Sequence, residues 1–487
     1  MSIHIYNSLT RKKEEFIPLN PPNVNIYTCG VTVYDESHIG HARSLYIFDV
    51  IRRYLQYRGF KVRFVRNITD IDDKIINRAR ELKEDWKDLV KKYIDRYYED
   101  LKSLGIEKAD EEPRATENIR DMIEHIEGLI AKGYAYTTDS GVYFSVRKFN
   151  EYGKLSGQSI DQMLSGARIE PDENKQDPLD FALWKTSKPD EPAWMSPWRK
   201  GRPGWHIECS VMSQKFLKTD TLDIHAGGRD LIFPHHENEI AQAEALTGKP
   251  FAKYWIHHGL LTINGQKMAK SLGNFVTIKD FINKYQDPGL LKLFFLSAHY
   301  SHPIDYTEDR IEECKKQKYG FDKFFSRLST WEQFWNHWYS QPDLVALKDR
   351  RKIELSEKER NKVDAICAKF EHAMDDDFNM PLALSSLFEL TDLGLSFISL
   401  DKEEGFNYVK NLLKKYLDIF GIKPREDYQL SEKAIEQLVE MEKARIQKDF
   451  KKSDSLRVSV TGKYHFVISN TASNLAIEIV DLPKEEK

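Results

Sequence analysis

A strand, a short turn and an amphipathic helix follow one another near the start of this chain. Residues 24–28 are apolar and rich in β-forming side chains, and residues 61–65 repeat that character. Between them, residues 42–57 carry large apolar side chains three and four positions apart, at Leu45, Phe48, Ile51 and Leu55. The order strand, helix, strand predicts a βαβ unit, which requires a parallel sheet.

The turn before the helix reads His38-Ile39-Gly40-His41. Its two imidazoles lie at or just before a helix N-terminus, where free N–H groups and the helix dipole favour anions. Gly40 lets a flat ligand approach the backbone closely. The turn is therefore suited to a nucleotide triphosphate, but two histidines at a helix start can equally serve as caps, and the spacing leaves both interpretations open.

A second segment, from Gly265 to Gly273, places two lysines between glycines. Lys267 and Lys270 are three residues apart, and the flanking glycines predict a mobile loop. Their ammonium groups would pair with phosphates and with a departing pyrophosphate. Lysine-rich surface loops are common, so this segment alone is a weak indication.

Length and charge restrict the class of protein. The 487 residues suggest about three domains. A formal net charge of −4 argues against binding nucleic acid through bulk charge, while leaving room for a local basic track. No apolar run approaches the roughly 18 residues that span a bilayer, and the first residues lack the apolar core of a signal peptide. The four cysteines show no disulfide framework, so we expect no membrane and a cytoplasmic location.

The pattern along the chain divides it into four parts. Residues 1–115 and 205–304 read as two halves of one α/β domain, and residues 116–204 as an insertion between them. Residues 305–487 are charged and helical. The expected helices there are 312–335, 357–374, 381–398 and 432–450.

Four scattered residues have the chemistry of a zinc site. Cys29 directly follows the first strand, and Cys209 lies at the start of the second α/β half. His235 and Glu239 are four apart on a predicted helix that begins near Pro234, so they share one face. Two thiolates, an imidazole and a carboxylate make a four-ligand zinc site. Single cysteines are more often buried apolar residues, and a His-x-x-x-Glu pair is more often a surface contact.

Longer strings point to one family. The segments TCGVTVYD, HIGHARS, NITDIDDKI, RPGWHIECS, FPHHENE and KMAKSLGNF resemble the bacterial cysteinyl-tRNA synthetases, which are class I aminoacyl-tRNA synthetases. The resemblance runs in order to about residue 310 and continues more weakly at residues 373–381 and 444–457. It implies a Rossmann-like, doubly wound parallel sheet with an inserted connective domain, followed by an all-α C-terminal bundle that contacts the tRNA stem and anticodon.

The resemblance also implies a reaction. Cysteine attacks the α-phosphorus of ATP, giving cysteinyl-adenylate and pyrophosphate, and the 3′-terminal ribose of tRNA(Cys) then takes the cysteinyl group. One zinc ion per subunit would be held by Cys29, Cys209, His235 and Glu239, and Mg²⁺ would accompany ATP. The residues that would handle the triphosphate are His38, Gly40, His41, Lys267 and Lys270. Asp230 would accept the ribose hydroxyls, although an acid in a turn is an equally good interpretation.

Three further positions match the family's cysteine pocket: Thr69, Trp205 and His225. Trp205 could instead be a core residue and His225 a satisfied strand-end histidine. Zinc would separate cysteine from serine because a hydroxyl cannot match a thiolate as its ligand, whereas an ordinary pocket discriminates such similar groups weakly. On that basis no editing domain is expected. The nearby Asp70, Asp72 and Asp73 read as turn and helix-start acids rather than as a metal cluster.

Two departures from the family pattern stand out. Ala269 replaces a serine in the lysine loop, and residues 458–487 lack the family's usual C-terminal pattern. Two rival functions stay open: a ligase that passes cysteine from cysteinyl-adenylate to an amino sugar, and an inactive paralogue that only binds tRNA or zinc. We expect a monomer.

Overall fold

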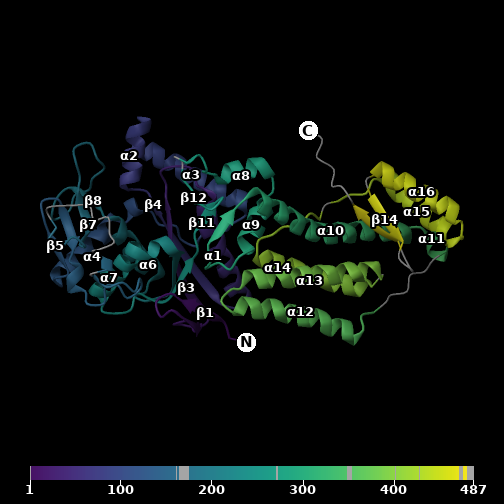
Figure 1. The fold of residues 1–487 in the computed structure, drawn as a ribbon, viewed down its shortest axis with the longest axis horizontal. Helices are drawn as coiled ribbons and strands as arrows, with labels where there is room; N and C mark the ends of the chain where they lie inside the picture. Colours follow the sequence, from purple (N-terminus) through teal and green to yellow (C-terminus); the bar gives the residue numbers. More distant parts are fainter. Residues whose placement is uncertain are drawn as a thin grey trace. The chain divides into compact units, whose positions relative to one another are not determined.

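A computed structural model describes residues 2–160, 162–163, 175–269, 272–347, 354–400, 402–426, 428–464, 466–470 and 475–479. The chain forms two compact units, and Figure 1 labels many of their elements. The first unit contains Met1–Pro288, Ala298–Thr307 and Asp375–Phe378. The second contains Gly289–Ser297, Glu308–Met374 and Asn379–Lys487.

A four-stranded parallel sheet forms the centre of the first unit. Its order is β10-β9-β3-β4, with every neighbouring pair parallel. The strands are β3 (Asn23–Thr32), β4 (Lys61–Thr69), β9 (Leu222–Gly228) and β10 (Ala252–His258). Helix α1 (Ile39–Tyr57) connects β3 to β4, so the predicted βαβ unit is confirmed.

Strand β3 lies at the point where the strand order reverses. The chain moves from β3 outward to β4, leaves the sheet, and returns on the other side of β3 as β9 and then β10. In open parallel sheets, ligands bind beside the carboxyl ends of the strands at such a switch point. The sheet topology therefore directs attention to the ends of β3 and β9.

A bulge interrupts β3 just before its end. The pairing of β3 with β4 shifts register between Thr28 and Val31, so Cys29 and Gly30 bulge out of the ladder. The Gly30 N–H donates to Asn67 Oδ1 at 2.8 Å. A Cβ at Gly30 would overlap the carbonyl oxygen of Asn67, so only glycine allows the two strands to approach this closely. Such bulges redirect a side chain, here that of Cys29.

Smaller elements surround the sheet. An N-terminal hairpin consists of β1 (His4–Asn7) and β2 (Lys12–Glu15), and helices α2 (Asp73–Leu82) and α3 (Trp86–Leu104) follow β4. The insertion contains η1 (Ala115–Glu117), α4 (Ile119–Ala131), η2 (Val146–Lys148) and a four-stranded antiparallel sheet of β5 (Ala135–Thr137), β6 (Gly141–Phe144), β7 (Phe181–Thr186) and β8 (Gly201–Pro203).

The second α/β half supplies the remaining elements of the first unit. They are α6 (Trp205–Leu217), η3 (Arg229–Leu231), η4 (Ile232–His236), α7 (Glu237–Thr247), β11 (Leu261–Ile263), β12 (Gln266–Lys267), α8 (Ile278–Tyr285) and β13 (Ile304–Tyr306). Helices α4, α6 and α7 contact one another. Their apolar faces share one buried core with residues of the central sheet and the insertion, including Tyr27, Phe144 and Trp255.

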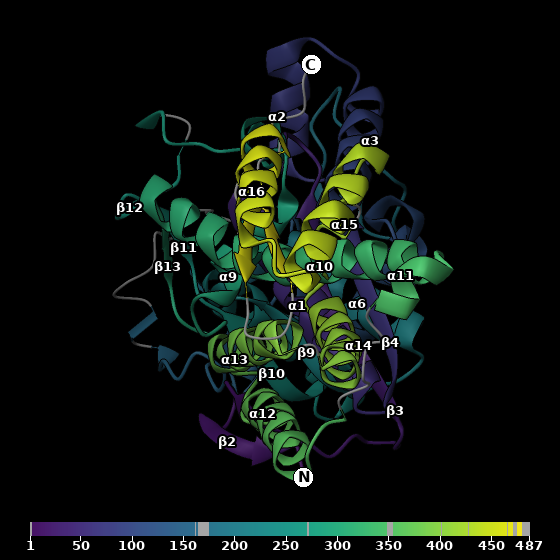
Figure 2. The same cartoon turned by 90° about the vertical axis from the view of Figure 1, so that its right-hand side faces the viewer.

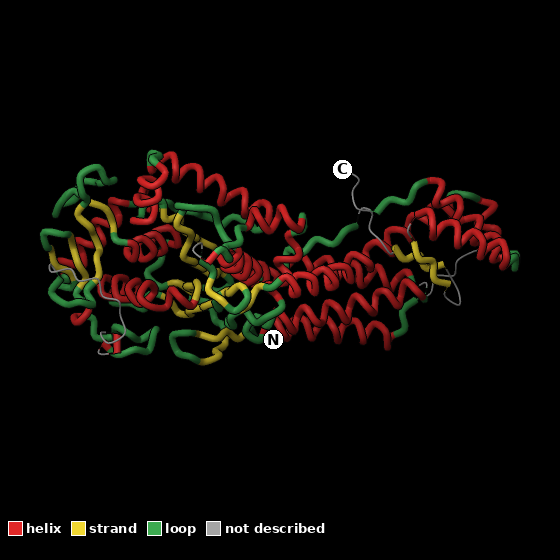
Figure 3. Tube along the Cα trace, turned by 45° about the horizontal axis from the view of Figure 1, so that its top comes forward, coloured by secondary structure: helices red, strands yellow, loops and turns green. Residues whose placement is uncertain are grey.

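The second unit is helical for most of its described length, as the red segments of Figure 3 show. It contains most of α9 (Pro288–Leu296), with α10 (Glu308–Tyr339), α11 (Pro342–Leu347), α12 (Glu357–Asp375), α13 (Met380–Ser399), α14 (Glu403–Ile419), α15 (Glu432–Ile446) and α16 (Phe450–Tyr464). Three of the helices expected from the sequence fall within α10, α12 and α13, whereas the expected helix 432–450 ends earlier, as α15 at Ile446, and a separate helix begins at Phe450. A short antiparallel hairpin of β14 (Phe466–Asn470) and β15 (Leu475–Ile479) follows and adds strands to a part expected to be all-α.

Contrary to the expectation from the sequence, one helix among the described residues, α13, is long and apolar enough to cross a bilayer. Half of its most apolar stretch is buried within the protein. It packs against α10 and α14, as Figure 2 shows for this part of the chain. These contacts are those of a core helix in a bundle.

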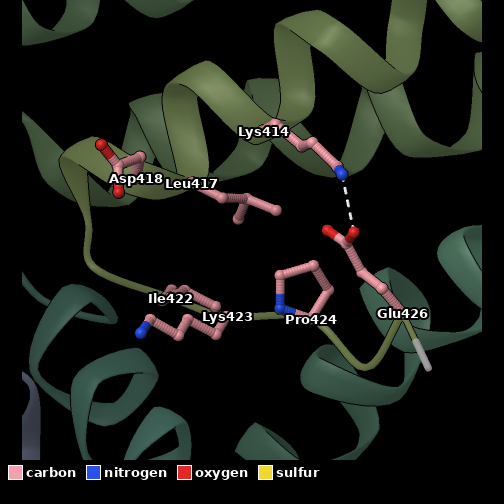
Figure 4. Close-up of a pocket in the computed structure, with 7 residues that line it drawn as sticks. All are labelled: Lys414, Leu417, Asp418, Ile422, Lys423, Pro424 and Glu426. Carbon is pink, nitrogen blue, oxygen red and sulfur yellow. Dashed lines mark hydrogen bonds and ion pairs between the residues drawn. The ribbon is translucent and has the colours of Figure 1, made fainter.

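A crevice of about 450 Å³ lies where α14 ends (Figure 4). Its apolar lining comes from Leu417, Ile422 and Pro424. The Lys414 ammonium pairs with Glu426 across it at 2.6 Å. Two of the charged residues that line this crevice, Lys414 and Glu426, therefore neutralise each other.

Candidate metal centre and active site

The structure brings the four predicted metal ligands together. Cys29 comes from the β3 bulge, Cys209 from α6, His235 from η4 and Glu239 from the first turn of α7. One ligand atom from each lies within 4.8 Å of all the others. Three of the side chains are buried and Cys29 is partly exposed, so the cluster has one accessible side.

The spacing of the ligand atoms fits a small metal ion. Glu239 Oε1 lies 2.9 Å from His235 Nε2 and 3.4 Å from Cys29 Sγ, and Cys209 Sγ lies 3.6 Å from His235 Nε2. Zinc bonds of 2.0–2.3 Å arranged tetrahedrally place neighbouring ligands about 3.3–3.8 Å apart. The donor set and its spacing therefore fit zinc without rearrangement of the backbone.

A second ligand set shares two members with the first. Cys29, His225, His236 and Glu239 also have ligand atoms within 4.8 Å of one another. We favour the first set because it uses both thiols, which are the ligands zinc binds most readily in such sites. In the second set, the buried Cys209 thiol would lie beside the ion without binding it.

The charges in the cluster depend on one another. Burial alone would raise the pKa of Glu239, but His225 and His235 hold it well below its usual range. Burial would likewise lower the pKa of His235, and the charge of Glu239 raises it instead to about 10. Burial raises the pKa of the Cys29 thiol well above its ordinary value. The buried Glu239 carboxylate thus has a cationic partner, His235, even without a metal ion.

Further histidines and an aromatic ring hold the ligands in place. His225 Nε2 lies 2.6 Å from Glu239 Oε2, the oxygen that does not face His235. His206 Nδ1 lies 2.9 Å from His235 Nδ1. The Trp205 ring stacks on His235 with ring centroids 3.9 Å apart. Metal ligands are commonly oriented by such outer contacts, which fix ring angle and tautomer.

Sequence reasoning missed the polar chain behind the cluster. Thr69 Oγ1 donates to Glu208 Oε2 at 2.8 Å, and Asn67 Nδ2 donates to Thr69 Oγ1 at 3.2 Å. Asn67 Oδ1 in turn accepts from Gly30 and lies 3.7 Å from the Cys209 thiol. The predicted Thr69 is therefore buried at the end of β4 and tied to both cysteine segments. The only feature of the sequence that could have indicated a role for Glu208 was its position next to Cys209.

The histidine turn does cap its helix. His38 Nδ1 accepts from the backbone N–H groups of Gly40 and His41, at 3.1 and 3.2 Å. His41 Nδ1 accepts from the His38 N–H at 3.3 Å, which completes a reciprocal capping box. The two rings stack with centroids 3.7 Å apart. Burial, followed by the charges of His38 and Lys74, lowers the pKa of His41 to about 3.

These hydrogen bonds fix the tautomers. A ring nitrogen that accepts cannot carry the proton in a neutral imidazole, so both protons reside on Nε2. The cap therefore uses Nδ1 of each ring, and the Nε2–H groups are not part of its hydrogen bonds. The capping and ligand-binding interpretations of the turn are therefore compatible.

The segment that directly follows the lysine loop lies beside the histidine turn. The Ile39 N–H donates to the Val276 carbonyl at 3.1 Å, and the Ile278 N–H donates to the Ser37 carbonyl at 3.0 Å. A narrow recess is lined by His38, His41, Phe275 and residues 31–37. Lys267 is exposed in β12, and the predicted Lys270 lies outside the described residues.

The structure also shows where the acidic residues considered in the sequence analysis lie. Asp230 is exposed in η3, directly after the end of β9. Asp70, Asp72 and Asp73 have separate partners: Thr116, the start of α2, and the pair Lys185 and Arg202. They do not group as a metal site within the part of the chain that the structure describes.

Known proteins are similar to this chain in sequence and fold. The family described as tRNA synthetases class I (C) catalytic domain matches residues 15–316, and the DALR domain matches residues 369–423. A cysteine–tRNA ligase of Thermodesulfovibrio yellowstonii is 49% identical over 483 residues, covering 95% of this chain and 96% of that one. A cysteine–tRNA ligase of Anoxybacillus flavithermus is 48% identical over 467 residues, covering 95% and 97%.

A solved structure supports the fold independently. Mycobacterium tuberculosis methionyl-tRNA synthetase in complex with methionyl-adenylate superposes with a TM-score of 0.60 at 15% identity, over 86% of this chain and 90% of that one. The parallel sheet, the histidine turn and the family match together define a class I aminoacyl-tRNA synthetase. Within that class, the chain belongs to the cysteine–tRNA ligase family.

Proposed function

We propose that this enzyme activates L-cysteine with ATP and transfers the cysteinyl group to the 3′-terminal ribose of tRNA(Cys). The observation that carries the proposal is the position of the thiol, imidazole and carboxylate cluster. One of its members, Cys29, is on β3, the switch-point strand that leads into the histidine turn. A site for a sulfur atom and a site for a triphosphate are thereby neighbours along one segment.

Cys29, Cys209, His235 and Glu239 would hold one zinc ion per subunit. When bound, zinc would supply a thiophilic Lewis acid that favours a thiolate ligand over a hydroxyl. The chain's own residues do the rest of the selection. Trp205 forms a wall on His235, His225 orients Glu239, and Thr69 is fixed by Glu208. Such a site needs no editing domain.

Catalysis of the first step would be positioning and charge stabilisation. The Nε2–H groups of His38 and His41 would donate to the triphosphate, and Gly40 would let ATP approach the backbone. Lys267 and Lys270 would stabilise the charge that develops on the pyrophosphate, with Mg²⁺ accompanying ATP. Asp230 would accept the ribose hydroxyls. Both lysines remain beside Ala269, so we expect the loop to keep its function.

We further propose the division of labour along the chain. Residues 1–115 and 205–304 would carry the two catalytic halves, residues 116–204 the connective insertion, and residues 305–487 the contacts with the tRNA stem and anticodon. Helices α15 and α16 present Lys443, Lys452 and Arg457 among mixed charges. A monomeric, cytoplasmic enzyme completes the proposal.

Cysteine-dependent exchange between ATP and radiolabelled pyrophosphate tests the overall function. We expect exchange with cysteine and at least about a thousandfold less with serine. A tRNA transcript with a cysteine anticodon should then be charged. Exchange followed by transfer to an amino sugar, with no charging, would establish the rival ligase instead. The near full-length match to cysteine–tRNA ligases favours charging. Absence of exchange would indicate the inactive paralogue.

Replacing His38 separates its two roles. His38→Asn keeps a side-chain acceptor at the cap position but removes the Nε2–H donor, so exchange should fall by about 10²–10³-fold with the melting temperature unchanged. The matched variant His38→Ala loses both groups. It should show the same loss of exchange and an additional destabilisation of about 1 kcal/mol. Normal exchange by His38→Asn would show that the histidine only caps the helix.

Replacing one thiol tests the metal site. Elemental analysis of purified protein should find about one zinc per chain. Cys209→Ser should weaken zinc binding by at least about tenfold and reduce the preference for cysteine over serine. Cys367→Ser, which changes a thiol in α12 of the second unit, is the matched control and should keep both properties. A Cys209→Ser protein that retained its zinc and its selectivity would contradict the assignment.

A further inference from the structure

Arg43 lies two residues after His41 on helix α1, and its side chain is fully buried. Its guanidinium donates to four backbone carbonyls of two other segments of the first unit. They are those of Gly259 at 2.7 Å, Leu260 at 2.9 Å, Tyr300 at 3.2 Å and His302 at 2.6 Å. We propose that Arg43 is a positioning residue, which keeps Lys267 in place relative to the histidine turn for the reaction with ATP. This inference rests on the proposed function, and in it Arg43 acts through other residues rather than on the substrate.

The Arg43 guanidinium is a buried cation held by neutral groups. It forms no ion pair with any residue that the structure describes, and burial lowers its pKa to about 10. A charge in a protein interior is costly, and an apolar side chain of similar size often gives equal or greater stability. Filling the core is therefore a poor explanation for an arginine at this position. What an apolar side chain cannot provide is one planar group on which four carbonyls converge.

The four carbonyls lie where strands β11 and β13 begin. Gly259 and Leu260 directly precede β11, and residues 300–302 precede β13. Strand β11 is the middle strand of a three-stranded sheet, with β13 on one side and β12 on the other. Lys267, in β12, pairs with Thr262 of β11. Because β12 lies at the edge of this sheet, the position of Lys267 follows that of β11.

The two segments that carry the carbonyls also contact each other. The Gly259 N–H donates to the Tyr300 carbonyl at 2.9 Å. The Ile304 N–H donates to the Leu260 carbonyl, also at 2.9 Å. A Cβ at Gly259 would lie 2.2 Å from the carbonyl oxygen of His302, so any side chain there would force the segments apart. Arg43 thus bonds to both segments at the place where they approach most closely.

The other side of the Arg43 contact is the histidine turn. Arg43 follows His41 in one continuous helix, so the guanidinium and the imidazoles are joined by the rigid backbone of α1. Met268 Cε lies 3.8 Å from the point that a Cβ at Gly40 would occupy. The residue after Lys267 therefore approaches the turn directly. A displacement of about 1 Å between groups that act on one ligand can cost about a hundredfold in rate, which is the effect that we expect from losing Arg43.

The kinetics of ATP–pyrophosphate exchange test this role. Arg43→Met fills a similar volume but has no donor, so kcat should fall about a hundredfold and the KM for pyrophosphate should rise. Zinc content and the KM for cysteine should not change, because the metal ligands come from other elements. Arg43→Lys keeps a cation and three donors but lacks the planar fork, so it should recover about tenfold of the lost rate.

The matched control is Arg52→Met, which removes another buried arginine of α1. The Arg52 guanidinium donates to the Lys108 carbonyl at 2.7 Å and to Asp110 at 3.2 Å, and neither residue belongs to the segments that Arg43 holds. This variant should lose stability and keep the wild-type kcat and KM values. It therefore separates a general loss of stability from a loss of positioning.

Hydrogen exchange tests the contact without relying on activity. In Arg43→Met, the amides of residues 259–267 should exchange faster than in wild type, and those of α6 and α7 should not change. A wild-type kcat in Arg43→Met, or an equal loss of kcat in Arg52→Met, would overturn the proposal. If Arg43→Met does not fold, Arg43→Lys decides: a kcat about tenfold below wild type supports the proposal, and a wild-type kcat contradicts it. A wild-type enzyme without any pyrophosphate exchange would count against the proposed function, and the amide comparison would still test the contact.

Discussion

A fully buried carboxylate, that of Glu239, is the constraint on which the rest of the site depends. An ionised carboxylate in a protein interior is costly unless opposite charges and hydrogen bonds surround it. Here each oxygen has its own imidazole, His235 at 2.9 Å and His225 at 2.6 Å. Two thiols complete the surroundings. Cys29 is distant in sequence from the other groups, which lie between residues 209 and 239, so the site requires β3 to pair correctly with β9.

The sheet meets that requirement through one close contact. Gly30 lies so near the Asn67 carbonyl that the two strands can meet only without a side chain at that position. The contact produces the bulge that turns Cys29 toward the cluster, and it lets Asn67 reach both Gly30 and the Cys209 thiol. A few residues further on, the same chain segment begins α1, whose two capping histidines use their Nδ1 atoms in the cap. Sulfur recognition and triphosphate recognition are thereby linked by one strand and one turn.

Much of this arrangement could be predicted from the sequence. Apolar periodicity predicted β3, α1 and β4, and the spacing of His235 and Glu239 predicted their shared helical face. The β3 bulge, the pairing of Glu208 with Thr69 and the contact of residues 276–278 with the turn could not, because each depends on partners far away in the chain. Strand β7 of the insertion could not be predicted for the same reason, because its pairing with β6 is a tertiary contact. The role of Lys270 stays a prediction.

The central proposal is that Cys29, Cys209, His235 and Glu239 would hold a zinc ion, which would recognise the sulfur of the substrate cysteine. X-ray absorption at the zinc edge of the purified enzyme measures this most directly. The account predicts two sulfur ligands in the free enzyme and three after cysteine is added, with bonds of about 2.3 Å, and no change with serine. A sulfur count that stays at two when cysteine saturates the enzyme would contradict it.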